Sequence, residues 1–286
     1  MTEALHIEGL CKQYADFQLN RVTFSLPMGC ILGFVGENGA GKTTTIKAIL
    51  NLIAIDGGSI SVLGLDHKKD EQAIKEQIGV VFDNSGFHSC LTAGDIESIL
   101  KRIYKNWDGA LYRGYLKKFD LPQNKQIKQF SKGMTMKLNI AAALAHRPRL
   151  LILDEATSGL DPIVREEILD IFLDFIQDEA HSILISSHIT SDLDKIADYI
   201  AFIHKGNLVF SRPKDELAGK MGVLKCSALD FQKLRASEIL RYRKSQFGYE
   251  ALLNDRYAFT RRHPDAVVDP ANIEEIMLFY IRGEVK

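Results

Sequence analysis

The chain has 286 residues, of which 46% are hydrophobic and 26% charged, and its 36 Lys and Arg residues nearly balance its 37 Asp and Glu residues. This length suits one large α/β domain with a small appendage, or two modest domains. The formal charge of −1 argues against a protein that binds nucleic acid or anionic lipid through bulk charge.

Targeting signals and metal motifs are not evident in the sequence. Residues Met1–Leu5 have no basic run followed by an apolar core, so we expect no secretory signal. No apolar stretch approaches the roughly 20 residues that a membrane-spanning helix needs. The four cysteines have no CxxC spacing, which predicts neither a zinc site nor a disulfide framework. We therefore expect a cytosolic protein that reaches a membrane only through a partner.

Short apolar runs alternate with helical patterns from His6 to about Pro213, which predicts a mainly parallel sheet covered by helices. The runs that we predict as strands are too short and too rich in apolar or β-branched residues for exposed helices. They are residues 31–35, 79–82, 150–153 and 182–185. This pattern predicts an α/β fold for the larger part of the chain.

The first predicted strand ends in a glycine-rich segment that fits G-x-x-x-x-G-K-[ST] without a mismatch and opens a predicted helix. Its backbone N–H groups can surround phosphate oxygens, and the helix N-terminus adds partial positive charge. Lys42 can supply a point charge to the β- and γ-phosphates, and Thr43 a hydroxyl to Mg²⁺. The motif predicts a nucleotide site formed by Gly36, Glu37, Asn38, Gly39, Ala40, Gly41, Lys42, Thr43 and Thr44.

Between about Leu91 and His146 the strand pattern disappears. Thr92–Asp95 resembles a capping box. Apolar residues then follow at helical spacing, at positions Ile96, Ile99, Leu100 and Ile103. We expect a helical insertion over about residues 91–146.

The apolar run Leu150–Leu153 ends in two adjacent carboxylates, Asp154 and Glu155. The carboxyl ends of parallel strands form the edge at which open α/β sheets bind ligands. We expect Asp154 to hold Mg²⁺, directly or through water, and Glu155 to polarise the attacking water as a general base. Such a pair alone is more often a helix cap or a loop anion, but behind a phosphate-binding loop it predicts a Mg-nucleotide triphosphatase.

The residues after Pro213 contain no motif that we can assign. Asp269 can cap a helix with Pro270 at its first position. That helix would place Ile273, Ile276, Met277 and Tyr280 on one face. We predict a domain boundary at 213/214 and a small α/β appendage over residues 214–286, used for dimer contact or regulation.

The order of these motifs resembles the nucleotide-binding domain of ABC ATPases from residue 5 to about residue 213. Phe130–Met134 is similar to a divergent form of the family signature, which is usually Leu-Ser-Gly-Gly-Gln. The resemblance implies a P-loop NTPase core with a helical insertion subdomain over residues 1–213. It also implies that Ser131 and the Gly133 backbone cap the γ-phosphate bound by another protomer.

Three further positions take their expected roles from the resemblance. Asp161 ends a segment, Ser158–Asp161, that is similar to the family's D-loop, and His188 matches its switch histidine. Tyr14 stands where an aromatic ring stacks on adenine. The resemblance therefore implies that Lys42, Glu155 and His188 are catalytic, and that Tyr14, Ser131, Gly133, Asp161 and His188 join the ATP site.

Two departures from the family pattern concern the same site. Asp83 stands where the family places a glutamine that contacts Mg²⁺ and the lytic water, so we expect a shorter, acceptor-only metal contact. In the signature, Lys132 replaces the first glycine and Met134 the glutamine. The Ser-Lys-Gly-Met form resembles that of single-cassette exporters of drugs, lantibiotics and antimicrobial or toxin peptides.

The resemblance implies an ATP-hydrolysing subunit, with ATP and Mg²⁺ as cofactors, that powers export of a drug, lipid or peptide through a separate membrane-spanning permease. An import role stays open. The alternative is a soluble ABC ATPase acting on ribosomes or DNA. The single P-loop argues against a ribosome factor, because such factors of this family usually fuse two cassettes. The interval between the P-loop and the signature, about 90 residues without sustained heptads, argues against a DNA-associated ATPase with a long coiled coil. We therefore expect no nucleic-acid partner.

The P-loop and the signature serve opposite faces of one nucleotide in this family. The resemblance therefore implies a homodimer or heterodimer of such subunits, arranged head to tail. The permease would hold this dimer at the inner face of the cell membrane. A groove between the Asp83 loop and the helical insertion would receive a short cytoplasmic helix of the permease. We expect Phe87, His88 and Trp107 to line that groove, although packing within the insertion is an equally good interpretation of these aromatic residues.

Overall fold

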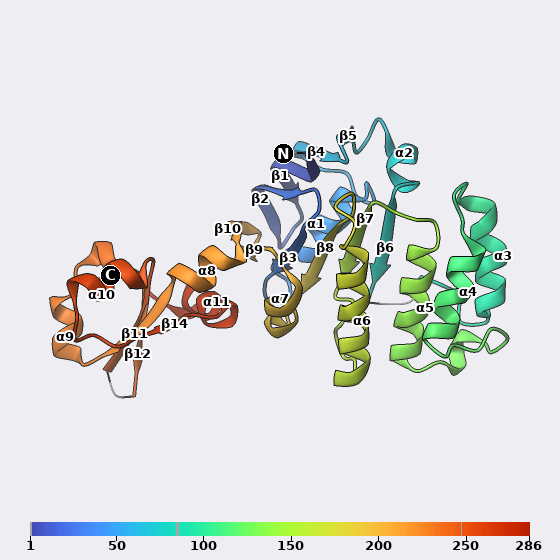
Figure 1. Cartoon of the computed structure of the whole chain (residues 1–286). Coiled ribbons are helices and arrows are strands. Elements are labelled where there is room, and N and C mark those ends of the chain that lie inside the picture. The colour runs from blue at the N-terminus through green and yellow to red at the C-terminus, as the bar shows by residue number, and fades with distance from the viewer. Residues whose placement is uncertain (1, 84–85, 247) are drawn as a thin grey trace. The chain divides into compact units, whose positions relative to one another are not determined.

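The computed structural model describes residues 2–83, 86–246 and 248–286 (Figure 1). The chain divides into two compact units, Met1–Phe210 and Ser211–Lys286, which are described separately. The boundary that the sequence predicts, at 213/214, falls at the end of strand β10 (Asn207–Pro213). None of the helices in the described ranges is long and apolar enough to cross a bilayer.

The first unit contains a six-stranded sheet of order β10-β9-β3-β8-β7-β6. The strands β3, β6, β7, β8 and β9 pair in parallel. Their bounds are Ile31–Val35, Ile78–Phe82, Leu150–Asp154, Ser182–Ser187 and Tyr199–His204. Every residue of β3, β7 and β8 is buried, as expected for parallel strands covered on both faces. The mainly parallel sheet and the α/β fold class are confirmed.

A second sheet of order β2-β1-β4-β5 is antiparallel and was not predicted. Its strands are β1 (Glu3–Gln13), β2 (Gln18–Pro27), β4 (Gly57–Val62) and β5 (Leu65–Asp66). Helix α1 (Lys42–Ile49) follows β3, and its Ile46 and Ile49 share one core cluster with residues of both sheets. Burial of this cluster therefore packs α1 against the sheets. The remaining core helices are α2 (Glu71–Lys75), α6 (Pro162–Phe175) and α7 (Thr190–Ile196).

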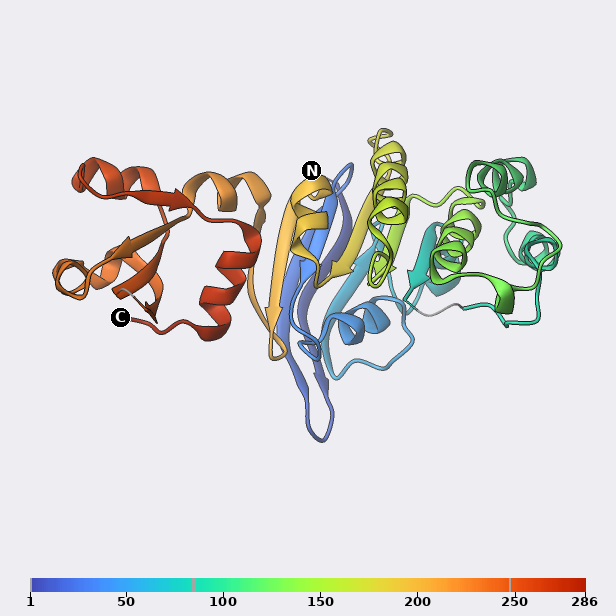
Figure 2. The ribbon, with the colours of Figure 1, turned by 90° about the horizontal axis from the view of Figure 1, so that it is seen from below.

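Helices α3 (Ala93–Ile103), α4 (Gly109–Lys118) and α5 (Lys132–Leu144) gather beyond β6, as Figures 1 and 2 show. The short 3₁₀ helix η1 (Ile127–Gln129) precedes α5. The capping box predicted for the start of α3 is present, since Thr92 and Asp95 exchange hydrogen bonds. The Tyr112 hydroxyl donates to the Ala93 carbonyl at 3.0 Å, which ties α4 to α3 in the buried interior.

The aromatic residues expected to line a docking groove do not do so together. Trp107 is half-buried, and its ring packs 5.2 Å from that of Tyr112 inside the helical insertion. Phe87 is also half-buried, whereas His88 is exposed with its Nδ1 3.1 Å from Cys90 Sγ. For Trp107 the structure agrees with the second interpretation, packing within the helical insertion.

The second unit is a small mixed α/β domain whose sheet has the order β12-β13-β11-β14. Residues Leu224, Phe231 and Phe259 lie in its own core cluster. Its strands are β11 (Gly222–Cys226), β12 (Ile239–Ser245), β13 (Gly248–Leu253) and β14 (Val268–Pro270). Its helices are α8 (Lys214–Lys220), α9 (Ala228–Lys233), η2 (Ala236–Glu238), α10 (Arg256–Arg262) and α11 (Ile273–Arg282).

The start of the last helix differs from the prediction. Asp269 and Pro270 lie in β14, and Asn272 caps α11 through a capping box with Glu275. The predicted apolar face is present, since Ile273, Ile276 and Met277 are buried. An asparagine three residues further on satisfies the first N–H groups equally well, so the cap residue was ambiguous from sequence.

Deleting residues 214–286 should leave ATP binding intact, because every chemical motif lies earlier and the main core cluster contains only residues of the first unit. We expect isothermal titration calorimetry to give the truncated and full-length chains the same ATP affinity within about threefold, a difference of roughly 0.6 kcal/mol. A truncated chain that is folded by circular dichroism yet has no ATP affinity would show that the second unit belongs to the site.

Candidate functional site

The glycine-rich loop connects β3 to α1 and leaves its backbone open at the start of the helix. Gly39 and Gly41 have φ of 79° and 117°, in the left-handed region that glycine adopts readily. A Cβ on Gly36 would lie 2.5 Å from the Ile203 carbonyl oxygen. Gly41 is the N-cap of α1, while Glu37 and Asn38 are exposed. A helix N-terminus with free N–H groups binds anions, so this loop can hold phosphates.

Lys42 is the first residue of α1 and its side chain is buried. Its Nζ donates to the Gly36 carbonyl at 2.8 Å and to the Glu37 carbonyl at 3.3 Å. The same ammonium lies 3.2 Å from Glu155 Oε1. The ammonium is thus fixed beside the loop, at the position from which it can reach a bound phosphate.

Asp154, at the end of β7, is 5% exposed and uses both carboxylate oxygens. Oδ2 accepts from Thr43 Oγ1 at 2.9 Å, and Oδ1 accepts from Ser186 Oγ at 2.6 Å. Ser186 is paired with Asp154 across the parallel strands β7 and β8. We missed Ser186 from sequence, because its role depends on its register beside Asp154 in the neighbouring strand.

Glu155 leaves β7 with φ of 55°, a left-handed conformation that is costly for a residue other than glycine. Its N–H donates to the Ser186 carbonyl at 3.1 Å. Its carboxylate lies between two groups, because Oε2 is 2.6 Å from His188 Nδ1 and Oε1 faces Lys42. His188 follows β8 and is partly exposed. The structure therefore brings Lys42, Glu155 and His188 into one cluster, and the catalytic roles expected for them stay predictions.

The signature and the D-loop lie outside this cluster. Ser131 is the N-cap of α5 and accepts from the Met134 N–H at 3.1 Å. Gly133 is buried, and a Cβ there would lie 3.2 Å from Val164 Cγ1. Asp161 caps α6 by accepting from the Val164 N–H at 3.0 Å. Within the described ranges, the hydrogen bonds of these side chains are local to their own helices.

Tyr14 lies in the turn between β1 and β2 with its side chain exposed. Its N–H donates to the Phe17 carbonyl at 2.8 Å, and a Cβ on Gly41 would lie 2.9 Å from the Phe17 ring. The turn that carries Tyr14 therefore touches the phosphate loop. The Tyr14 ring itself is exposed, with Lys12 Nζ 5.4 Å from its centroid, and its stacking on adenine stays a prediction.

Asp83 directly follows β6, and its Oδ1 lies 2.8 Å from Lys132 Nζ. In the part of the chain that the structure describes, its carboxylate makes no bond to Thr43 or Asp154. Residues 84 and 85, which follow Asp83, lie outside the described ranges. The metal contact expected of Asp83 stays a prediction.

The oxygens of Thr43 and Asp154 fit the requirements of Mg²⁺. Hydroxyl and carboxylate oxygens are hard ligands, and Mg²⁺ is usually held by one or two carboxylates together with phosphates and waters. No cluster of three or more His, Cys, Asp or Glu side chains suited to a metal occurs among the described residues. Mg²⁺ bound to Thr43 and Asp154 would take its remaining ligands from nucleotide phosphates and waters.

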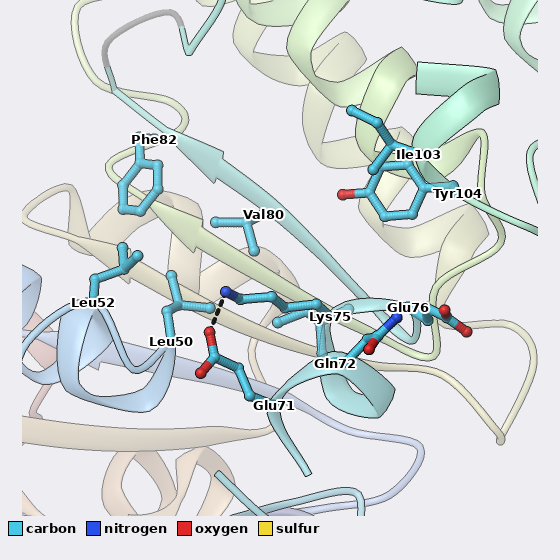
Figure 3. Close-up of a pocket in the computed structure, with 11 residues that line it drawn as sticks. Leu50, Leu52, Glu71, Gln72, Lys75, Glu76, Val80, Phe82, Ile103 and Tyr104 are labelled. Atoms are coloured by element: carbon cyan, nitrogen blue, oxygen red, sulfur yellow. Dashed lines mark hydrogen bonds and ion pairs between the residues drawn. The ribbon is translucent and has the colours of Figure 1, made fainter. Parts of the chain in front are cut away.

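A cavity of about 670 Å³ opens where α2, β6 and the end of α3 meet (Figure 3). Its walls are mainly apolar, and α2 contributes a polar rim that includes the ion pair between Glu71 and Lys75. Leu52 and Ile103 are 55% and 62% exposed at this cavity. The apolar lining consists of Leu50, Leu52, Ile78, Val80, Phe82, Ile103 and Tyr104.

Comparison with known proteins identifies the family. The family model for ABC transporters matches residues 19–158. The bacitracin transport ATP-binding protein BcrA of Enterococcus faecalis is 34% identical over 212 residues, covering 73% of this chain and 69% of that protein. The lantibiotic transport ATP-binding protein SrtF of Streptococcus pyogenes is 34% identical over 214 residues, covering 74% of this chain and 91% of that protein.

Solved structures agree with this assignment. The structure of an ATP-binding subunit of an ABC transporter is 26% identical with a TM-score of 0.69, covering 76% of this chain and 92% of that one. A nucleotide-free ATP-binding cassette at 20% identity has a TM-score of 0.63 and covers 74% and 92% of the two chains, which shows the shared fold. This chain belongs to the ABC transporter family and is an ATP-binding subunit with the ATP hydrolase domain of that family.

Proposed function

We propose that this chain hydrolyses ATP to power export of a drug, lipid or peptide through a separate membrane-spanning permease. The observation that carries the proposal is the position of Glu155. Its carboxylate lies between Lys42 and His188, beside the Thr43–Asp154 pair at the phosphate loop. This arrangement places a base, a cation and metal-binding oxygens at one sheet edge, which suits phosphoryl transfer to water.

In the proposed reaction, the backbone of residues 36–44 binds the phosphates and Tyr14 stacks on the adenine. Lys42 exchanges its contacts with the Gly36 carbonyl and Glu155 for β- and γ-phosphate oxygens. Glu155 is then free to accept a hydrogen bond from the attacking water, and His188 keeps its carboxylate oriented. Mg²⁺ held by Thr43 and Asp154 would neutralise charge that develops on the phosphate oxygens.

The proposed working unit is a head-to-tail pair of ATP-binding subunits. Ser131, Gly133 and Asp161 lie outside the cluster in their own chain, and the N-terminus of α5 can receive an anion. A second subunit would bring these residues to the γ-phosphate held by Lys42. Two identical chains would then form two sites related by twofold symmetry. Hydrolysis removes the phosphate bridge, and the pair separates.

Export is supported by the printed names of the relatives, which are bacitracin and lantibiotic transport ATP-binding proteins. The Ser-Lys-Gly-Met signature is consistent with that class. The alternative, a soluble ABC ATPase acting on ribosomes or DNA, gains no support from these names. The chemical class of the cargo therefore stays at the level of a drug, lipid or peptide.

We propose that the apolar cavity beside β6 binds a short cytoplasmic helix of the permease. Grooves lined by apolar side chains accept the apolar face of an amphipathic helix. The rim residues Glu71, Lys75 and Glu76 carry positive and negative charges, which can orient such a helix. Because β6 ends next to Asp83, a helix bound in this cavity would be coupled to the position of Asp83.

The test is affinity purification of the tagged chain from membranes of the native cells. We expect an integral membrane protein to co-purify with the chain in an equimolar amount. The purified complex should hydrolyse ATP. Ile103→Asp should lose that protein yet still bind ATP, because it places a charge in the apolar cavity. Leu173→Asp, at an exposed position on α6, is the control and should retain it.

Recovery of ribosomes or DNA in place of a membrane protein would contradict the exporter proposal. Retention of the membrane protein by Ile103→Asp would contradict only the docking site.

A further inference from the structure

Lys132 and Asp83, the two charged residues that depart from the family pattern, form an ion pair. Lys132 Nζ lies 2.8 Å from Asp83 Oδ1, and the side chains are 47% and 43% exposed. Lys132 is the first residue of α5, whereas Asp83 follows β6. The pair therefore joins the sheet edge of the core to the signature helix.

The ammonium of Lys132 also lies close to the D-loop segment, Ser158–Asp161, which follows the proposed general base Glu155 in the chain. A Cβ on Gly159 would be 3.1 Å from Lys132 Nζ, and Gly159 has φ of 67°. Gly159 is four positions after Glu155 in the chain. A side chain at position 159 would thus compete with the ammonium for space, which shows how closely Lys132 approaches the D-loop.

The charge of Lys132 is unfavourable where it stands. A cation at the first position of a helix is destabilised by the partial positive charge of the N-terminus. The first turn of α5 contains no acidic residue, so the compensating carboxylate comes from Asp83. An anion that approached this N-terminus from another molecule would supply the same compensation.

We propose that Lys132 is an additional cation for the γ-phosphate of ATP bound by the partner subunit, and that Asp83 holds it until the pair of subunits closes. The inference rests on the proposed head-to-tail pair, in which the neighbouring Ser131 and Gly133 face that phosphate. A half-exposed ion pair is weak, so a doubly charged phosphate can displace Asp83 from the ammonium. Asp83 then opposes closure, and Lys132 favours it.

A purely structural role for the Asp83–Lys132 ion pair leads to a different prediction. If the ion pair only braces the core against α5, removing either charge should weaken the closed pair of subunits. In our proposal the two removals have opposite effects. Removing the charge of Asp83 changes the affinity between subunits only while Lys132 is present. The double substitution should therefore behave like the substitution of Lys132 alone.

The experiment measures the ATP-dependent dimerisation constant by analytical ultracentrifugation of chains that also carry Glu155→Gln, which prevents hydrolysis. Asp83→Asn should tighten the dimer by about two- to fivefold, at most roughly 1 kcal/mol. Lys132→Gln should weaken it by about tenfold and reduce its dependence on salt. The double substitution should match Lys132→Gln alone. Lys137→Gln, which breaks the α5 ion pair with Glu167, is the control and should change nothing.

Weakening by both single substitutions, or no change with either, would overturn the proposal, as would a double substitution that behaves like Asp83→Asn. Thermal unfolding of each chain separates these outcomes from loss of the fold. If the parent Glu155→Gln chain does not dimerise in ATP with its membrane partner present, the head-to-tail pair itself fails. In that case this inference fails with it.

Discussion

Glu155→Gln should slow ATP hydrolysis by about two orders of magnitude or more while ATP still binds. Glutamine keeps the shape of the side chain but removes the negative charge that orients and polarises water. It also removes the ion pair with Lys42, whose ammonium stays anchored by the Gly36 carbonyl. Single-turnover hydrolysis with radiolabelled ATP measures the chemical step, and calorimetry measures binding separately.

The control for this substitution is Glu166→Gln. Glu166 pairs with Lys195 at the surface of α6, away from the phosphate loop, so its loss should leave the rate within about twofold of the unmodified chain. Normal hydrolysis by Glu155→Gln would show that another group activates the water.

Lys42→Ala should abolish hydrolysis and lower ATP affinity by about a hundredfold, because charge-assisted bonds to the β- and γ-phosphates are lost. No other lysine or arginine occurs in the motif at residues 36–44. The buried ammonium also separates Glu155 Oε1 from the Gly36 carbonyl, so its removal takes a partner from each of these oxygens, while Oε2 keeps its contact with His188.

Lys47→Ala is the matched control, since Lys47 is exposed in the last turn of the same helix. Titration with a fluorescent ATP analogue gives the affinity, and phosphate release gives the rate. Retention of full ATPase activity by Lys42→Ala would contradict the assignment of the phosphate loop.

Sequence reasoning succeeded where one short segment carries both the chemistry and its backbone requirement. The glycine-rich loop needs left-handed residues at Gly39 and Gly41, and glycine tolerates them, so motif and geometry coincide. The carboxylates Asp154 and Glu155 were placed correctly because the ends of buried parallel strands meet at one edge. The cluster of Lys42, Glu155 and His188 followed from these two facts and the family resemblance.

Features that depend on contacts between distant segments were harder to predict from the sequence. Ser186 was missed because its role comes from its register beside Asp154, and a serine in a strand has no signal of its own. For Trp107 the sequence left a groove and local packing equally open, and its ring packs on Tyr112 in the next helix. An exposed and a packed aromatic residue look alike in sequence.

The Asp83–Lys132 contact shows the same limit more clearly. The sequence revealed two separate departures from the family pattern, far apart in the chain. Only the structure shows that the two side chains lie 2.8 Å apart and compensate each other's charge. The antiparallel sheet β2-β1-β4-β5 was likewise absent from the prediction, and its central pairing joins β1 to β4, two strands far apart in the sequence.

The central claim is that ATP joins two subunits head to tail and that hydrolysis at Glu155 separates them. Size-exclusion chromatography with light scattering tests it most directly, by measuring the mass of the Glu155→Gln chain in ATP and in ADP. We predict twice the mass of one chain in ATP and the mass of one chain in ADP, with the unmodified chain returning to single subunits as ADP forms. A Glu155→Gln chain that binds ATP yet keeps the mass of a single chain, even with its membrane partner present, would contradict the account.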